Sequence, residues 1–133
     1  MHEPLPVALI GTTSGTGSEV SGVSVLTNGK TGRKKSISGA DCYAKIVFAD
    51  PRYTESMPYD VTVSTCLDAL SHAVEGFFTS KCTDIPMMFA KKAIPMLWEC
   101  IVTMYNKRLL ENVSPAEAYS LPDGEMRENL YYG

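Results

Sequence analysis

The chain has 133 residues and a formal net charge of −3, and 44% of its residues are hydrophobic while 20% are charged. These values are typical of a globular protein with a core of its own, and they exclude a chain too polar to fold. Because the acidity is mild and the Lys and Arg residues are scattered, we expect no nucleic-acid partner. No apolar run approaches the roughly 20 residues of a membrane span, so we expect no membrane association.

The four cysteines, Cys42, Cys66, Cys82 and Cys100, form no C-x-x-C pair. Neither a zinc ribbon nor a thioredoxin-like motif is therefore predicted. A chain of this length does not need disulfides to fold, and no secretory signal peptide is visible. We expect reduced thiols in a cytoplasmic protein.

The first 50 residues predict strands and loops. Residues 5–10 form an apolar run that ends at a glycine, which favours a buried strand. Residues 22–28 alternate with β-branched side chains up to an Asn-Gly pair, and 34–38 supply a return strand, which together predict a hairpin. A further apolar run over 44–49 predicts another strand, which stops at Asp50-Pro51.

Residues 11–19 are nine residues without an apolar side chain, and three of them are glycines. Such a segment cannot pack a core, but its backbone N–H groups and hydroxyls can contact an anion. It matches neither phosphate motif that we tested. Gly17 stands where the P-loop needs Lys, and Val20 stands where the Rossmann fingerprint needs its third glycine. A polar loop of turn residues therefore stays open as the alternative.

The second part of the chain predicts helices. One spans 60–78 and another runs from about 84 to 106, where Pro95 is expected to kink it. Two more are expected to begin at Ser114 and at Asp123. With strands first and helices after, the predicted fold class is α+β.

Three predictions concern the faces of these helices. Asp60 is expected to be the N-cap of the first helix. Its apolar stripe is expected to consist of Leu67, Leu70, Val74, Phe77 and Phe78. The core stripe of the second helix is expected to consist of Ala90, Ile94, Leu97, Ile101 and Met104 or Tyr105, and Trp98 is also expected in the core.

Asp68, His72 and Glu75 stand at i, i+4 and i+7, so their side chains project from one stripe of the first helix. A carboxylate and an imidazole one turn apart can supply two ligands to a divalent metal. A simple side-chain pair on a solvated face is the alternative. Two ligands are also too few for a site, and the only other histidine is His2.

Three stretches together resemble the iron-containing (group III) alcohol dehydrogenases: Thr12–Glu19, Asp50–Pro58 and Asp68–Glu75. The resemblance implies an N-terminal Rossmann-like dinucleotide-binding domain and a C-terminal all-helical domain, with the active site in the cleft between them. Residues 1–56 would then be the last part of the first domain, and residues 57–133 the first part of the second.

The resemblance also implies roles for individual residues. Asp68 and His72 would be two ligands of Fe²⁺ or Zn²⁺, and no catalytic nucleophile is implied. Contacts to NAD(P) would come from Thr12, Thr13, Gly15, Thr16, Lys34 and Thr54. The implied reaction is hydride transfer between the nicotinamide and a small alcohol, aldehyde or ketone, with the metal acting as a Lewis acid.

The sequence also departs from the pattern of this family. The Gly-Gly-Gly-Ser diphosphate motif would lie before residue 1, and two further histidine ligands would lie after residue 133. We therefore expect a central fragment that is inactive alone and forms a homo-oligomer. Cys66 stands where the family usually has a glycine. The alternatives are a non-catalytic structural or oligomerisation module and a fragment of a zinc enzyme related to glycerol dehydrogenase.

Overall fold

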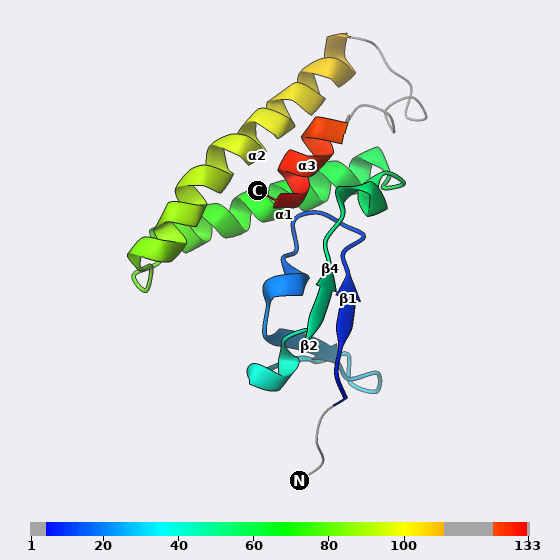
Figure 1. Cartoon of the computed structure of the whole chain (residues 1–133), viewed down its shortest axis with the longest axis vertical. Helices are drawn as coiled ribbons and strands as arrows, with labels where there is room; N and C mark the ends of the chain where they lie inside the picture. Colours follow the sequence, from blue (N-terminus) through cyan, green and yellow to red (C-terminus); the bar gives the residue numbers. More distant parts are fainter. Residues whose placement is uncertain (1–4, 111–123, 133) are drawn as a thin grey trace. The chain divides into compact units, whose positions relative to one another are not determined.

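The computed structural model describes residues 5–110 and 124–132, and its contacts divide the chain into two compact units. The strand unit comprises the residues up to Gly11 together with Gly17–Asp50. The helical unit comprises Thr12–Thr16 and the chain from Pro51 onward. Strands precede helices along the chain, so the α+β class is confirmed (Figure 1).

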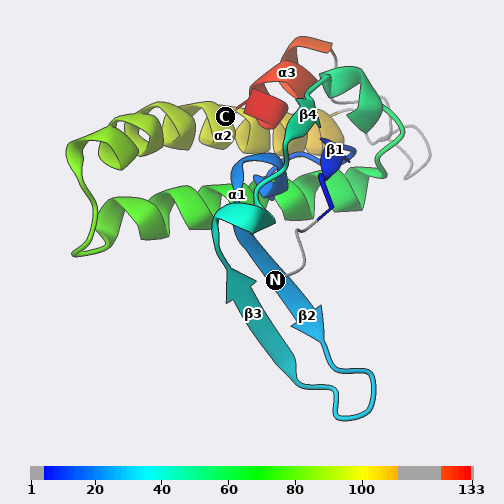
Figure 2. The ribbon, with the colours of Figure 1, turned by 60° about the horizontal axis from the view of Figure 1, so that its bottom comes forward.

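The strand unit contains two separate two-stranded sheets. In one, β1 (Ala8–Ile10) pairs with β4 (Ile46–Phe48) in parallel, with Leu9 opposite Val47. In the other, β2 (Val23–Thr27) and β3 (Lys34–Ser38) form an antiparallel hairpin, which Figure 2 shows with its connecting loop. The predicted strands are therefore confirmed in position, although β1 is shorter than the predicted run. The expectation that this strand is buried is wrong, because Ile10 is exposed and Leu9 is only partly buried.

Local turn chemistry explains the hairpin. The side-chain oxygen of Asn28 accepts a hydrogen bond from the Lys30 N–H at 2.9 Å, and its carbonyl accepts one from the Gly32 N–H at 2.8 Å. Gly32 has a φ of 66°, in the left-handed region where a glycine meets no steric penalty. Residues within the turn thus fix the register of β2 on β3.

The helical unit begins with a short 3₁₀ helix, η3 (Pro51–Thr54), followed by α1 (Tyr59–Phe78), α2 (Asp84–Leu110) and α3 (Gly124–Tyr132). In Figure 1, α1 and α2 lie side by side, and α3 packs against α2 and η3. The predicted first and second helices are confirmed. Helix α2 continues through Pro95 and ends later than predicted. The helix predicted to begin at Ser114 lies outside the described residues.

The predicted N-cap of α1 is wrong. The helix begins at Tyr59, so Asp60 lies inside its first turn and Pro58 occupies the cap position. The Pro58 carbonyl accepts hydrogen bonds from the N–H and the hydroxyl of Thr62, at 2.9 and 3.0 Å. Pro58 supplies no side-chain cap, and its extended ψ of 146° marks it as the residue just before the first helical turn.

The predicted apolar stripe of α1 is also largely wrong. Leu67, Val74 and Phe78 are exposed, and Leu70 is only partly buried against the core. The buried residues of α1 are instead Tyr59, Thr62 and Cys66, with small residues such as Ala69 and Ala73 packed against the core beside them. The core consists of Tyr59, Cys66, Ala93, Leu97, Cys100, Met104, Met126 and Leu130.

The predicted stripe of α2 is confirmed at Ala90, Leu97 and Met104, all of which are buried. Trp98 was expected in the core, but 60% of it is exposed, so this prediction is wrong. On a helix, adjacent residues point about 100° apart, so the burial of Leu97 directs Trp98 away from α1.

The four cysteines are free, as expected. Within the described ranges, none of the helices is both long enough and apolar enough to cross a membrane.

Candidate functional site

Asp68 and His72 form a pair on the solvent-facing side of α1. Nε2 of His72 lies 3.4 Å from Oδ2 of Asp68, and the two side chains are 65% and 54% exposed, respectively. Glu75 lies on the same stripe and is also exposed. The stripe faces away from the helical core, because Cys66 on the opposite side of α1 is buried.

The chemistry of this pair suits a divalent metal in part. A carboxylate oxygen and an imidazole nitrogen are both common ligands of Fe²⁺ and Zn²⁺. Across residues 5–110 and 124–132, no group of three or more His, Cys, Asp or Glu side chains could hold a metal ion. The described part of the chain therefore offers two ligands, and a complete coordination shell needs others.

Gly15 brings the glycine-bearing loop onto α1. Its φ of 99° is one that side-chain-bearing residues rarely adopt. A Cβ at this position would collide with the carbonyl oxygen of Thr65 and lie 3.2 Å from the Cβ of Ala69. The neighbouring Ser14 is buried, whereas Thr12 and Thr13 are exposed. Only a glycine lets the loop main chain approach the helix this closely.

This contact places the loop beside the Asp68–His72 pair. At 100° per residue, Thr65, Asp68 and His72 fall within a sector of about 60° around α1. Two segments separated by about 50 residues of sequence thus meet on one helix face of the helical unit. A loop able to contact an anion and a pair able to bind a cation therefore lie on the same side of α1.

The remaining predicted cofactor contacts are Thr16, which belongs to the same loop, and Lys34 and Thr54, which lie outside it. Thr16 is exposed at the end of the loop, and Lys34 is exposed on β3, opposite Thr27, in the strand unit. Thr54 is buried, and its hydroxyl donates a hydrogen bond to the Pro51 carbonyl at 2.7 Å. That hydroxyl is therefore already hydrogen-bonded within η3. Its role toward a cofactor stays a prediction.

The structure also reveals Arg127, a residue that sequence reasoning missed. It belongs to α3, and its guanidinium donates a hydrogen bond to the Thr54 carbonyl. Burial lowers the pKa of this guanidinium, while the charge of Glu55 acts in the opposite direction. No local pattern marks this residue, because its partner is 73 positions away.

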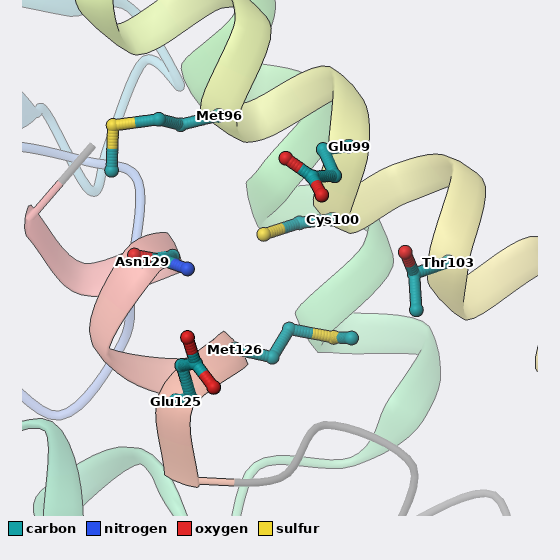
Figure 3. Close-up of a pocket in the computed structure, with 7 residues that line it drawn as sticks. All are labelled: Met96, Glu99, Cys100, Thr103, Glu125, Met126 and Asn129. Carbon is teal, nitrogen blue, oxygen red and sulfur yellow. The ribbon is translucent and has the colours of Figure 1, made fainter.

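A cavity of about 330 Å³ lies between α2 and α3, apart from these residues. Figure 3 shows Glu99, Cys100 and Asn129 pointing into the space between the helices. The other lining residues are Met96, Thr103, Glu125 and Met126. None of the predicted site residues lines this cavity.

Comparison with protein families matches both parts of the chain. Residues 1–51 match the family described as iron-containing alcohol dehydrogenase. Residues 62–120 match the C-terminal region of the Fe-containing alcohol dehydrogenase family. The two matches follow each other in chain order and leave only a short gap around η3.

Comparison with individual proteins and solved structures points to the same family. The probable alcohol dehydrogenase EutG of Escherichia coli is 37% identical over 93 residues, which are 70% of this chain and 24% of EutG. The structure of sulfoacetaldehyde reductase from Bifidobacterium kashiwanohense in complex with NAD⁺ aligns with a TM-score of 0.71 and 31% identity. The NADH-dependent butanol dehydrogenase of Thermotoga maritima gives the same TM-score and identity.

These alignments cover only part of each relative. Both structures match 96% of this chain, but only 33% and 29% of the two solved chains. The chain therefore spans about a quarter to a third of the length of these relatives.

Proposed function

Because the chain belongs to the iron-containing alcohol dehydrogenase family, we propose that it supplies part of the site at which an NAD-dependent dehydrogenase oxidises an alcohol or reduces a carbonyl compound. The observation that carries the proposal is the contact of Gly15 with Thr65. It puts a loop suited to a dinucleotide beside a pair suited to a metal, and metal-assisted hydride transfer to or from a nicotinamide needs both the cofactor and the metal near the substrate.

The proposal gives the two segments separate tasks. The backbone of the Thr12–Thr16 loop, with the hydroxyls of its threonines, contacts the diphosphate and ribose of the dinucleotide. Asp68 and His72 hold a divalent metal, which supplies Lewis acidity to the substrate oxygen when it is bound. The close approach of Gly15 to α1 keeps these two tasks within one site.

The finer assignments belong to the same proposal. Iron is favoured by the name of the family, and NAD by the relative solved with NAD⁺ and by the NADH-dependent butanol dehydrogenase. Zn²⁺ and NADP are the alternatives. A small alcohol or aldehyde is the substrate class that the named relatives suggest. Residues 1–56 and 57–133 are assigned to the dinucleotide-binding and metal-binding domains of such an enzyme, and the protein is expected to be a cytoplasmic homo-oligomer.

A metal titration tests the proposal on this chain. Co²⁺ serves as a visible probe of the divalent site, and binding is measured by absorption and by calorimetry. We expect saturable but weak binding, because the described residues offer only two ligands. Asp68→Asn and His72→Gln are each expected to weaken Co²⁺ binding by at least about tenfold, since each removes one ligand.

Glu75→Gln is the matched control, because Glu75 lies on the same exposed stripe and the proposal gives it no ligand role. We expect it to leave Co²⁺ affinity within about twofold of the unsubstituted chain. If Co²⁺ does not bind, or if Glu75→Gln lowers affinity as much as His72→Gln does, the metal assignment is wrong.

A further inference from the structure

Arg127 is a charged residue on the core-facing side of α3. Only 5% of it is exposed, and the neighbouring Met126 and Leu130 are buried with it. Arginine is almost never buried to this extent unless its donors are paired. One of its donors reaches across 73 residues of sequence to the carbonyl oxygen of Thr54. The guanidinium therefore links α3 to the end of η3.

The Thr54 carbonyl, which accepts this bond, belongs to a turn that leads into α1. The Thr54 carbonyl also accepts a hydrogen bond from the Met57 N–H at 3.0 Å, which closes the turn over 54–57. The next residue, Pro58, accepts the first hydrogen bonds of α1 from Thr62. Both bonds to the Thr54 oxygen therefore act on the segment from which α1 starts.

A second arginine, Arg108, also contacts the start of α1, but its side chain is exposed. The guanidinium of Arg108 lies 5.0 Å from the centre of the Tyr59 ring, and its Nη1 lies 3.8 Å from Oδ1 of Asp60. Solvent screens this ion pair strongly, because both side chains are exposed. Of the two arginines, the buried Arg127 is therefore expected to anchor the helix start more strongly.

We propose that Arg127 is a positioning residue: by holding the Thr54 carbonyl it fixes the start of α1, and through this helix it fixes the placement of Asp68, His72 and the contact with Gly15. The last step rests on the proposed function. The anchoring of α1 does not depend on that function, so the two can be tested separately.

The test of anchoring compares Arg127→Met and Arg127→Lys with Arg108→Met as the matched control, by amide hydrogen exchange resolved by NMR. In Arg127→Met we expect protection of the Met57 and Thr62 amides to fall by at least about tenfold, because a buried charge-assisted bond is lost. The protection of amides around Leu97 in α2 should fall much less. Lysine can still donate to the carbonyl, so Arg127→Lys should recover part of the protection.

In Arg108→Met, protection at these two amides should change by less than about twofold. An equal loss of protection throughout the helical unit of Arg127→Met would show a purely global role and overturn the proposal. Unchanged protection at Met57 and Thr62 would also overturn it.

A Co²⁺ titration of the same variants tests the link to the site. Arg127→Met keeps both proposed ligands, yet we expect its Co²⁺ affinity to fall by about tenfold and its saturated absorption spectrum to change, while Arg127→Lys restores part of both. A role in stability alone would leave the spectrum of the saturated, folded protein unchanged, and this result would overturn the positioning of the ligands. If the unsubstituted chain binds no Co²⁺ but local exchange responds as expected, the proposed function fails and the anchoring stands.

Discussion

Cys66 shows how a single buried residue can control the response of the chain to pH. Its thiol lies in the core between α1 and α2 and donates a hydrogen bond to the Leu97 carbonyl, at 3.8 Å. Burial, with a smaller contribution from the nearby Cys100, raises the pKa of this thiol to about 12. The folded chain thus holds the Cys66 proton more tightly than the unfolded chain does.

The sign of the pH dependence follows from this difference. The stabilisation is fully present below the unfolded pKa of 9.0 and is lost as the pH rises toward the folded value. Between these values, Cys66 should lower the free energy of unfolding by about 1.4 kcal/mol per pH unit. Cys66→Ala should remove this contribution. Urea denaturation of both proteins at about pH 8 and about pH 10 measures it, and equal losses of stability in both would contradict the prediction.

At the scale of single elements, the hairpin and α1 differ in what the sequence could predict. The turn of the hairpin depends on Asn28 and Gly32, whose signals are local, so β2 and β3 were predicted well. The core face of α1 depends on small residues such as Cys66, and the larger Leu67 beside it misled the prediction. Which stripe of an amphipathic helix is buried depends on the helix that packs against it, and the sequence of α1 alone does not place α2.

In the candidate site, too, local spacing predicts some contacts, whereas others arise only from packing. The spacing of Asp68 and His72 along one helix was enough to predict that their side chains meet. The contact of Gly15 with Thr65 and the bond from Arg127 to Thr54 join segments about 50 and 73 residues apart. No local periodicity encodes such contacts, because they arise only when the helices pack.

The corrected core of α2 leads to a prediction for two adjacent residues. Only 1% of Leu97 is exposed, so Leu97→Ala should lower the free energy of unfolding by about 2–5 kcal/mol through lost burial and a cavity. Trp98→Ala should cost under about 1 kcal/mol, although it removes the larger side chain. Urea denaturation followed by circular dichroism is the measurement, because Trp98 is the only tryptophan and its fluorescence disappears in that variant. A larger loss in Trp98→Ala would place Trp98 in the core after all.

At the scale of the whole chain, the two units differ in how much they bury. Among the described residues of the strand unit, only Gly22 is buried, where the ring of Tyr43 covers it. Ile10, Val25 and Phe48 are all exposed. Two-stranded sheets are only marginally stable in water, and parallel sheets normally have both faces covered. The strand unit therefore has little buried apolar surface of its own to stabilise it, whereas the helical unit has a core.

Amide hydrogen exchange measured by mass spectrometry should separate the two units. In dilute solution, peptides that contain β1–β4 should exchange at least about a hundredfold faster than peptides from the α1–α2 core, because local opening of the strand unit exposes almost no apolar surface that was buried. Equal protection of both units in dilute solution would contradict this prediction. If a second copy of the chain covers the exposed strands, as expected of a homo-oligomer, their protection should rise with protein concentration while that of α1 and α2 stays constant.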